Sequence, residues 1–187
     1  GRVAGFGQIR VFRFHPEDGS LEETDCFRSR EFAEPRHLAM HPNNRYAYMI
    51  NERDSSMTYF EFDNKKGKLI PRQILSTLPD TYTGNGQASA SLVDPTGQIL
   101  IGSNRIHESL VLYRINQDTG YLTTLGFFPV LGKTPRFITF NKEGTRLYVA
   151  NEDSDTIVEM KLDADKGLIE YTGRIIRTES PVCVTFK

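Results

Sequence analysis

Three stretches of this chain repeat one pattern, and the repeat constrains the fold more than any other feature. In each stretch an asparagine is followed sixteen residues later by a glycine: Asn51 and Gly67, Asn104 and Gly120, Asn151 and Gly167. Upstream of each asparagine a turn-forming segment leads into an alternating run, as in "MHPNNRYAY", "VDPTGQILI" and "FNKEGTRLYV". The first interval is longer because a polar, glycine-rich segment, "LPDTYTGNGQ", is inserted at residues 78–87. Repeats at a fixed period indicate an array of similar supersecondary units.

Each repeat predicts four short strands. In the last repeat they are "RFITF", "RLYVAN", "TIVEMKLD" and "LIEYTGRIIR", rich in β-branched and aromatic residues and separated by turn-forming ones. No segment keeps a 3.6-residue apolar period over three turns, so no long helix is expected. Four-stranded antiparallel units that recur every ~40–50 residues are typical of a β-propeller, and the predicted class is all-β.

The two ends of the chain align with parts of a repeat. "GRVAGFGQIRVFRFHPEDGSL" matches the second half of a unit, with Gly19 at the position of Gly67 and Val3 at that of the asparagine, and "SPVCVTFK" matches the first strand "TPRFITF". The chain 1–187 is therefore predicted to be a single partial propeller of about four blades. Its predicted parts are the end of a blade (1–34), a blade (35–77), a blade with a loop insertion (78–134), a blade (135–180) and the first strand of a closing blade (181–187).

Raw edges at both ends of such an array invite pairing with further strands. We expect the missing blades to come from a preceding segment of the chain or from a second chain.

Composition argues against several partners. With 23 basic and 24 acidic residues the net charge is −1, so no general attraction to nucleic acid or to an anionic membrane is expected. No apolar run approaches the ~20 residues needed to span a bilayer, and the first residues do not resemble a secretory signal. Cys26 and Cys183 form no metal or disulfide pattern and are expected to be buried. A cytoplasmic location fits this cysteine usage.

The repeat places charged residues at one end of the inner strands. Arg36 and Glu52 lie sixteen residues apart, on either side of a hairpin, so antiparallel pairing should make them neighbours. Arg136 and Glu152 have the same spacing, whereas in the middle unit the asparagine is followed by Arg105. Because the first strand of every propeller blade lines the central channel, these five side chains should gather at one channel mouth.

Two interpretations of this cluster stand side by side. Guanidinium groups bind carboxylate or phosphate and can stabilise a developing oxyanion, and a carboxylate can act as a general base, so the cluster would suit a small anionic substrate. Alternatively, each pair is a structural ion pair between hairpin ends, of little energetic worth. Its recurrence in two blades favours the structural interpretation for at least one pair.

The segments "EPRHLAMHPNNRYAYMINERDSSMTYFEFD", "GKTPRFITFNKEGTRLYVANEDSDTI" and "SPVCVTF" resemble the lactonase family of seven-bladed β-propellers. That family includes bacterial 6-phosphogluconolactonases and fungal 3-carboxy-cis,cis-muconate cyclases. The resemblance runs over essentially the whole chain and covers roughly the C-terminal half of the family's length. It implies a hydrolase of a small anionic sugar lactone such as 6-phosphogluconolactone. A carboxymuconate cyclase is the enzymatic alternative, and a non-catalytic binding or scaffold module is the other.

The resemblance also implies roles for residues. Arg36, Glu52 and Arg105 match active-site positions of the cyclase branch and are predicted to be catalytic, with Glu52 as the base. Residues predicted to contact the substrate are Arg136, Asn51, Asn104, Glu152 and His37. Two features depart from the family: its active-site histidine lies upstream of this chain, and Ala90 and Leu92 stand where the family often has an acid and a histidine.

The histidines and acidic turns indicate no metal or cofactor. His37 should point to the face opposite Arg36 on an alternating strand, where packing or a hydrogen bond is favoured over catalysis. The other histidines, His15, His41 and His107, fall in turns and have no metal-ligand spacing. The acidic turn 163–170 lacks the ligand order of a calcium loop.

Overall fold

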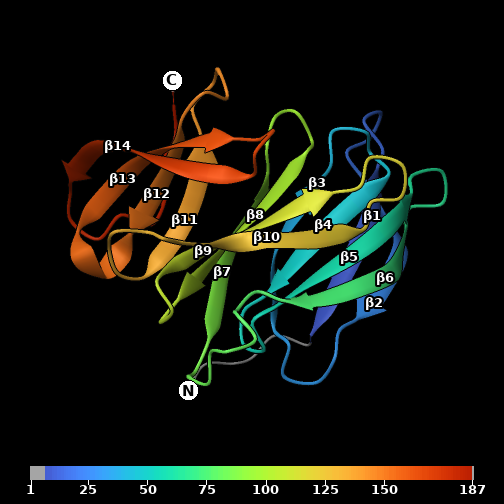
Figure 1. Ribbon diagram of the computed structural model, residues 1–187. Helices are drawn as coiled ribbons and strands as arrows, with labels where there is room; N and C mark the ends of the chain where they lie inside the picture. Colours follow the sequence, from blue (N-terminus) through green and yellow to red (C-terminus); the bar gives the residue numbers. More distant parts are fainter. Residues whose placement is uncertain (1–6, 187) are drawn as a thin grey trace.

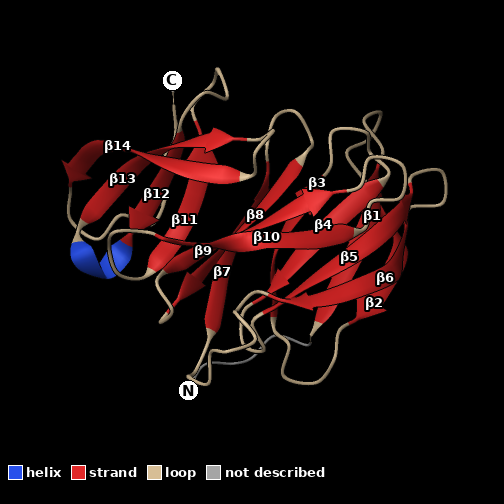
Figure 2. Cartoon of the chain, viewed as in Figure 1, coloured by secondary structure: helices blue, strands red, loops and turns tan. Residues whose placement is uncertain are grey.

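The computed structural model describes residues 7–186, and nearly all of its regular structure is β-strand (Figures 1 and 2). The first sheet has two strands, β1 (Gln8–Phe14) and β2 (Leu21–Arg28). The second has β3 (Pro35–Met40), β4 (Tyr46–Asn51), β5 (Ser56–Asp63) and β6 (Lys68–Ser76). The third has β7 (Gln87–Val93), β8 (Ile99–Arg105), β9 (Ser109–Ile115) and β10 (Leu122–Pro129). The fourth has β11 (Pro135–Phe140), β12 (Leu147–Asn151), β13 (Thr156–Asp163) and β14 (Leu168–Arg177), with a single 3-10 turn, η1 (Glu152–Ser154), after β12.

Every sheet is an antiparallel meander in which strands pair in chain order. This confirms the predicted all-β class and its four-stranded units. The repeated glycines are required by the turn between the third and fourth strands, where Gly67, Gly120 and Gly167 have φ of 64°, 76° and 66°. At Gly120 a Cβ would also come within 2.3 Å of the Tyr59 hydroxyl oxygen, so this turn packs directly against the second sheet.

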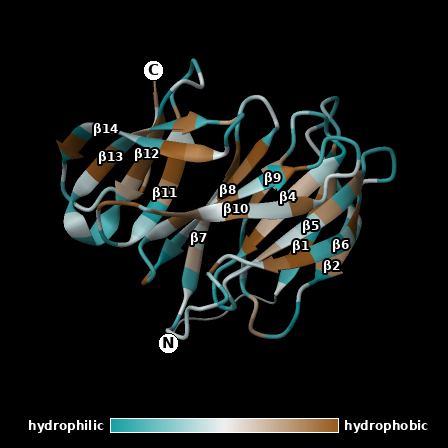
Figure 3. Cartoon of the chain, in the orientation of Figure 1, coloured by the Kyte–Doolittle hydropathy of each residue, from teal (hydrophilic) through white to brown (hydrophobic). Residues whose placement is uncertain are grey.

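The sheets are arranged like the blades of a fan, with the first strands of the three four-stranded sheets together (Figure 1). Strand β7 contacts both β3 and β11, so the first strands of the three four-stranded sheets are neighbours. The second strands β4 and β8 are buried along their whole length, whereas the fourth strand β14 is exposed at nearly every residue. Apolar residues gather on the strands and polar ones on the loops (Figure 3).

The contacts between sheets differ in character. Between the third and fourth sheets lies an aliphatic cluster that includes Ile99, Ile101, Leu112, Val149 and Met160. Burying one such side chain contributes roughly 1.5–3 kcal/mol. The second and third sheets are joined instead by tyrosines.

The phenol groups of this tyrosine cluster donate to one turn. The hydroxyls of Tyr46, Tyr48 and Tyr59 donate to the carbonyl oxygens of Asp118, Gly120 and Thr119, over 2.7, 2.9 and 2.6 Å. Because buried hydroxyls need partners, these bonds fasten the β9–β10 turn to the second sheet.

Both cysteines are exposed free thiols, so the prediction that they are buried is wrong. In the two-stranded first sheet one face, including Phe27, packs against the second sheet. Alternation along β2 therefore turns Cys26 to the uncovered face. Cys183 lies in the segment 181–186, which belongs to none of the described sheets.

The predicted first strand at 181–187 is not a strand over residues 181–186, because no strand in the described range pairs with it. Its Phe186 ring still packs 5.2 Å from the ring of Tyr148. Lys187 and residues 1–6, including Val3, lie outside the described residues.

Candidate active site

Glu52, just after β4, is the centre of a cluster of charged side chains. Its Oε2 lies 3.2 Å from Arg36 Nε on β3, which confirms that the two ends of this hairpin are neighbours. Its Oε1 lies 2.7 Å from Nη2 of Arg105, at the end of β8 in the next sheet. Gln87, at the start of β7, donates from Nε2 to the same oxygen over 2.9 Å. Both carboxylate oxygens are therefore already engaged.

A β-bulge at the start of β3 brings His37 to the same side as Arg36. Pro35 pairs with Asn51 but His37 pairs with Ile50, so Arg36 is an extra residue in the ladder. The side chains of Arg36 and His37 meet, with Nη1 and Nε2 3.2 Å apart. The prediction that they face opposite ways is wrong because the bulge interrupts the alternation. A guanidinium only donates, so Nε2 is the acceptor and a neutral His37 carries its proton on Nδ1.

The same irregularity recurs at the start of β7 and β11. It makes Arg136 the extra residue in β11, and in β7 it places Ser89 where the other two sheets have arginine. Arg36 Nη1 donates to the Ser89 carbonyl oxygen over 2.6 Å, and Ser89 Oγ donates to the Arg136 carbonyl oxygen over 2.9 Å. Ser89 thus joins the three first strands. Sequence reasoning missed Ser89 and Gln87, although Ser89's alignment with the two arginines could have revealed it.

The second Arg/Glu pair lies at the same end of the inner strands. Arg136 Nη1 and Glu152 Oε2 are 3.1 Å apart. The side chains of this pair are 37% and 25% exposed, whereas Arg36 and Glu52 are each 18% exposed and Arg105 only 6%. The charges of Arg136 and Glu152 still reach Arg36. All five charged residues therefore gather at one end of the inner strands, and the buried part is the triad Arg36, Glu52 and Arg105.

Burial and charge together set the protonation of the cluster. Burial raises the pKa of Glu52, but the hydrogen bond and charge of Arg105, with Arg36, outweigh it and hold that pKa below its usual value. Burial, then the charge of Arg36, lowers the pKa of His37. Burial, then Arg105, lowers the pKa of Arg36, which as an arginine remains a cation. Near neutral pH the cluster therefore contains an ionised Glu52 and a neutral His37.

Donors for an anion remain on the arginines. Within the described residues these side chains bond through Arg36 Nε and Nη1 and through Arg105 Nη2, which leaves Arg36 Nη2 and Arg105 Nη1 available. Two guanidinium groups are thus fixed by one carboxylate while each keeps N–H groups to spare.

The predicted asparagines make structural hydrogen bonds. Asn51 is 2% exposed and Asn104 is fully buried. Asn104 Nδ2 donates over 2.5 Å to the carbonyl oxygen of Thr77, which follows β6 of the preceding sheet, and Asn151 Nδ2 reaches Val130 in the same way over 3.3 Å. Each ties two sheets together, so we leave the asparagines out of the proposed site.

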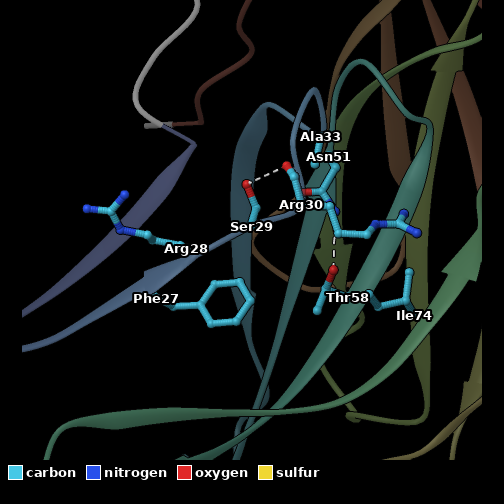
Figure 4. A pocket seen from close by; sticks show the side chains of 8 residues that line it. All are labelled: Phe27, Arg28, Ser29, Arg30, Ala33, Asn51, Thr58 and Ile74. Atoms are coloured by element: carbon cyan, nitrogen blue, oxygen red, sulfur yellow. Dashed lines mark hydrogen bonds between the residues drawn. The ribbon is translucent and has the colours of Figure 1, made fainter.

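Asn51 differs because its amide bonds within its own sheet, to Ser56 Oγ over 2.8 Å and to Thr58 Oγ1 over 3.2 Å. It lines a pocket of about 240 Å³ between the first and second sheets, near Ser29 and Arg30 (Figure 4). Asn104 and Asn151 each bond to the preceding sheet, whereas the side chain of Asn51 lies at the pocket between its sheet and the preceding one.

Ala90 and Leu92 belong to the core rather than to the charged cluster. Ala90, where the family often has an acid, is 2% exposed in the aliphatic core, and Leu92 packs against that core. Within residues 7–186 no group of three or more His, Cys, Asp or Glu side chains could hold a metal ion. No helix in that range is long and apolar enough to cross a membrane.

Comparison with known proteins gives consistent results. The chain is 29% identical over 180 residues to the 6-phosphogluconolactonase of Bacillus subtilis, covering 96% of this chain and 52% of that protein. It is 28% identical over 185 residues to the 6-phosphogluconolactonase of Klebsiella pneumoniae, covering 97% of this chain and 56% of that protein. The chain thus spans about half the length of the curated relatives it matches.

Solved structures show the same fold. A Bacteroides uniformis protein described as a candidate 6-phosphogluconolactonase superposes with a TM-score of 0.88 at 28% identity, covering 98% of this chain and 52% of that one. The periplasmic gluconolactonase of Pseudomonas aeruginosa gives 0.86 at 24% identity, covering 95% and 50%. The predicted cytoplasmic location stays a prediction, since one neighbour is named periplasmic. The sequence profile described as "Lactonase, 7-bladed beta-propeller" matches residues 3–186, and the chain belongs to that family as part of its β-propeller.

Proposed function

We propose that this chain supplies the anion-binding site of a lactonase-family hydrolase whose substrate is a small anionic sugar lactone such as 6-phosphogluconolactone. The observation that carries the proposal is the buried triad, in which Glu52 fixes Arg36 and Arg105 while both keep N–H groups that no described residue occupies. Relatives named 6-phosphogluconolactonase support the substrate class. Because the chain spans about half of those relatives, the activity belongs to the whole protein and is part of the proposal.

The charge balance favours an anion. Three arginines and two glutamates leave the cluster with a net positive charge, and the water-poor surroundings of the triad strengthen its interaction with a phosphate or carboxylate. In the proposed reaction Arg36 and Arg105 bind the anionic group or the oxygen that becomes negative when the lactone carbonyl is attacked. Arg136, more exposed, would meet the substrate at the rim.

The role of Glu52 follows from its partners. A general base works best with a pKa near the working pH. The Glu52 carboxylate is held by two guanidinium groups and Gln87, and its pKa lies below its usual value, which makes it a weak base. We therefore propose that it positions the two guanidinium groups, rather than acting as the base that the sequence suggested.

Hydrolysis of 6-phosphogluconolactone by the whole protein, followed by proton release against the spontaneous rate, tests the proposal. Arg36→Ala should lower kcat/KM by about 10²–10³, the usual effect of removing an oxyanion donor. Glu52→Gln should also lower kcat/KM, because it removes the charge that positions both guanidinium groups. Arg72→Ala is a matched control, because Arg72 forms a comparable ion pair with Glu61 at 2.7 Å on the exposed β5–β6 surface. Turnover that is equal in the wild type and all three variants would refute the site.

A carboxymuconate cyclase remains the second candidate, because Arg36, Glu52 and Arg105 match the positions of that branch. Assaying 3-carboxy-cis,cis-muconate beside the lactone separates the two reactions. Binding of both compounds without turnover of either would favour a binding module.

We also propose that further strands pair with the ends of this array, from a preceding segment or a second copy of the chain. The support is a set of exposed apolar side chains at both ends: Phe12, Phe14, Ile175, Ile176 and Val182. Mass measurement in solution tests the second source: a dimer supports it, and a stable monomer with these side chains in water rules it out.

A further inference from the structure

We propose that His37 is the proton acceptor of this site, and that Arg36 masks it until an anion binds. The proposal rests on the proposed function, because it concerns the step in which water attacks the lactone. It gives the reaction the base that Glu52 does not provide.

Arg36 masks His37 by donating one of its N–H groups to the imidazole. Nε faces Glu52 over 3.2 Å, while Nη1 serves both the Ser89 carbonyl oxygen, over 2.6 Å, and His37 Nε2, over 3.2 Å. Since a guanidinium cannot accept, the lone pair of His37 Nε2 is the one that Arg36 occupies. The contacts to Glu52 and His37 are equally long, but the first joins opposite charges whereas the second joins a cation to a neutral ring, so an anion that attracts the Arg36 fork weakens the contact to His37 first. Binding of the anion thereby frees the imidazole lone pair.

Of the three aligned positions that follow the β-bulge, only that of His37 holds a histidine. The residue after the bulge is Ala90 in β7 and Phe137 in β11, so the propeller fold does not require histidine at this position. The other described histidines have other partners: His41 Nε2 lies 2.9 Å from the Gly97 carbonyl oxygen, and His107 Nδ1 lies 2.7 Å from Ser109 Oγ. The ring of His15 lies beside the carboxylates of Glu17 and Glu22. His37 alone touches the arginine that we propose binds the substrate.

The groups around His37 define its electrostatic setting. From its own sheet it faces Arg36, which disfavours protonation, and Glu52, which favours it. Strand β7, which packs against β3, contains no charged residue, and its Ser91 donates to the His37 carbonyl oxygen over 3.4 Å. Arg105, Arg136 and Glu152 act on this corner through Arg36. An anion on Arg36 therefore shifts the balance at His37 towards the protonated form.

The chemical step balances as follows. The water oxygen bonds to the lactone carbonyl carbon, its proton passes to His37 Nε2, and the carbonyl π pair becomes an oxyanion beside the guanidinium groups. The carbon–ring-oxygen bond then breaks as the carbonyl reforms, and the departing ring oxygen takes the proton from the imidazolium. The product is a hydroxy acid, which releases one proton to solvent on ionising.

Nitrogen-15 NMR of the histidine side chains tests the masking, with 6-phosphogluconate as the probe. In the free protein His37 should be the Nδ1–H tautomer, and saturating 6-phosphogluconate should raise its pKa by about one unit, as a nearby opposite charge does. The resonance is assigned with His37→Gln. If the probe binds and the His37 titration is unchanged, this inference is wrong while the proposed site stands. If the probe does not bind, the proposed function fails, and the inference with it.

Enzyme kinetics distinguish proton transfer by His37 from a role in which His37 only positions Arg36. In His37→Gln the side-chain carbonyl can still accept from Arg36 but cannot take a proton. We expect kcat to fall about 10²–10⁴-fold, with 6-phosphogluconate affinity within about twofold of the wild type, and His107→Gln to change neither. A His37→Gln variant that keeps wild-type kcat would show that His37 only positions Arg36, and would overturn the proposal.

Discussion

The pairs Arg36–Glu52 and Arg136–Glu152 have the same sequence spacing, the same β-bulge and the same hairpin, yet different surroundings. The first pair is joined by Arg105 and Gln87 from the third sheet and is mostly buried. The second makes a single 3.1 Å contact and is more exposed. The difference comes from the neighbouring sheet, since residues at the start of β7 and the end of β8 complete only the first pair. The position of each pair in its own sheet is therefore set by the repeat, whereas its burial and further partners are set by the adjacent sheet.

Ser89 is the residue on which this comparison depends most. It occupies the arginine position of the bulge in the middle sheet, is fully buried, and lies against Arg36 and Arg136. Ser89→Arg would make the three bulges alike but would place a third guanidinium in a filled, already cationic space. We expect a loss of about 3–5 kcal/mol in the free energy of unfolding, as for an unpaired buried charge.

Urea denaturation measures this loss, with Ser89→Ala as the control for size. Ser89→Ala should cost about 1 kcal/mol, for one hydrogen bond. A Ser89→Arg variant as stable as Ser89→Ala would mean that the site tolerates three arginines in the bulges.

Replacing each glutamate by glutamine compares the two pairs directly. Glu52→Gln leaves Arg105, only 6% exposed, without its counter-charge, and should cost about 3 kcal/mol. Glu152→Gln breaks an exposed pair and should cost under about 1 kcal/mol. Both are read from urea midpoints at constant m value. Equal losses would mean that the third sheet adds nothing to the first pair.

These contrasts mark what the sequence could predict. The repeated Asn and Gly positions, with alternating apolar runs, predicted four-stranded antiparallel sheets, and the hairpin geometry predicted that Arg36 meets Glu52. Both depend on local patterns that recur along the chain. The sequence did not predict the β-bulge beside His37, because a one-residue irregularity leaves the apolar pattern almost unchanged.

The sequence also could not predict the contacts between sheets. Arg105 was expected at the channel mouth but not as the second partner of Glu52, since that depends on the twist between adjacent sheets. The burial of Asn51 and Asn104 is a similar case. An asparagine beside a charged cluster resembles a ligand contact in sequence, and only the position of the preceding sheet shows that Asn104 is a tie to Thr77. Cys26 is exposed rather than buried because the sequence does not show which face of the first sheet is covered.

The smallest effect we predict is a dependence of the free energy of unfolding on pH. It measures how strongly the folded protein favours the ionised form of Glu52. The folded protein holds the pKa of Glu52 below its ordinary 4.5, so folding favours the carboxylate. That contribution is complete above pH 4.5 and is lost as the pH falls through the lower folded pKa. The wild type should therefore lose stability relative to Glu52→Gln as the pH is lowered from about 6 to about 3.

Glu152→Gln is the control, because it keeps Glu52 with Arg36 and Arg105 and should follow the wild type over this range. The lowered pKa of His37 acts in the same direction, since the unfolded chain takes up its proton first below its ordinary 6.5, but His37 is present in all three proteins and largely cancels. Urea unfolding at each pH provides the three curves. If the wild-type and Glu52→Gln curves stay parallel, Glu52 is no more strongly held as a carboxylate than in the unfolded chain. The buried triad would then have no electrostatic advantage over the exposed pair.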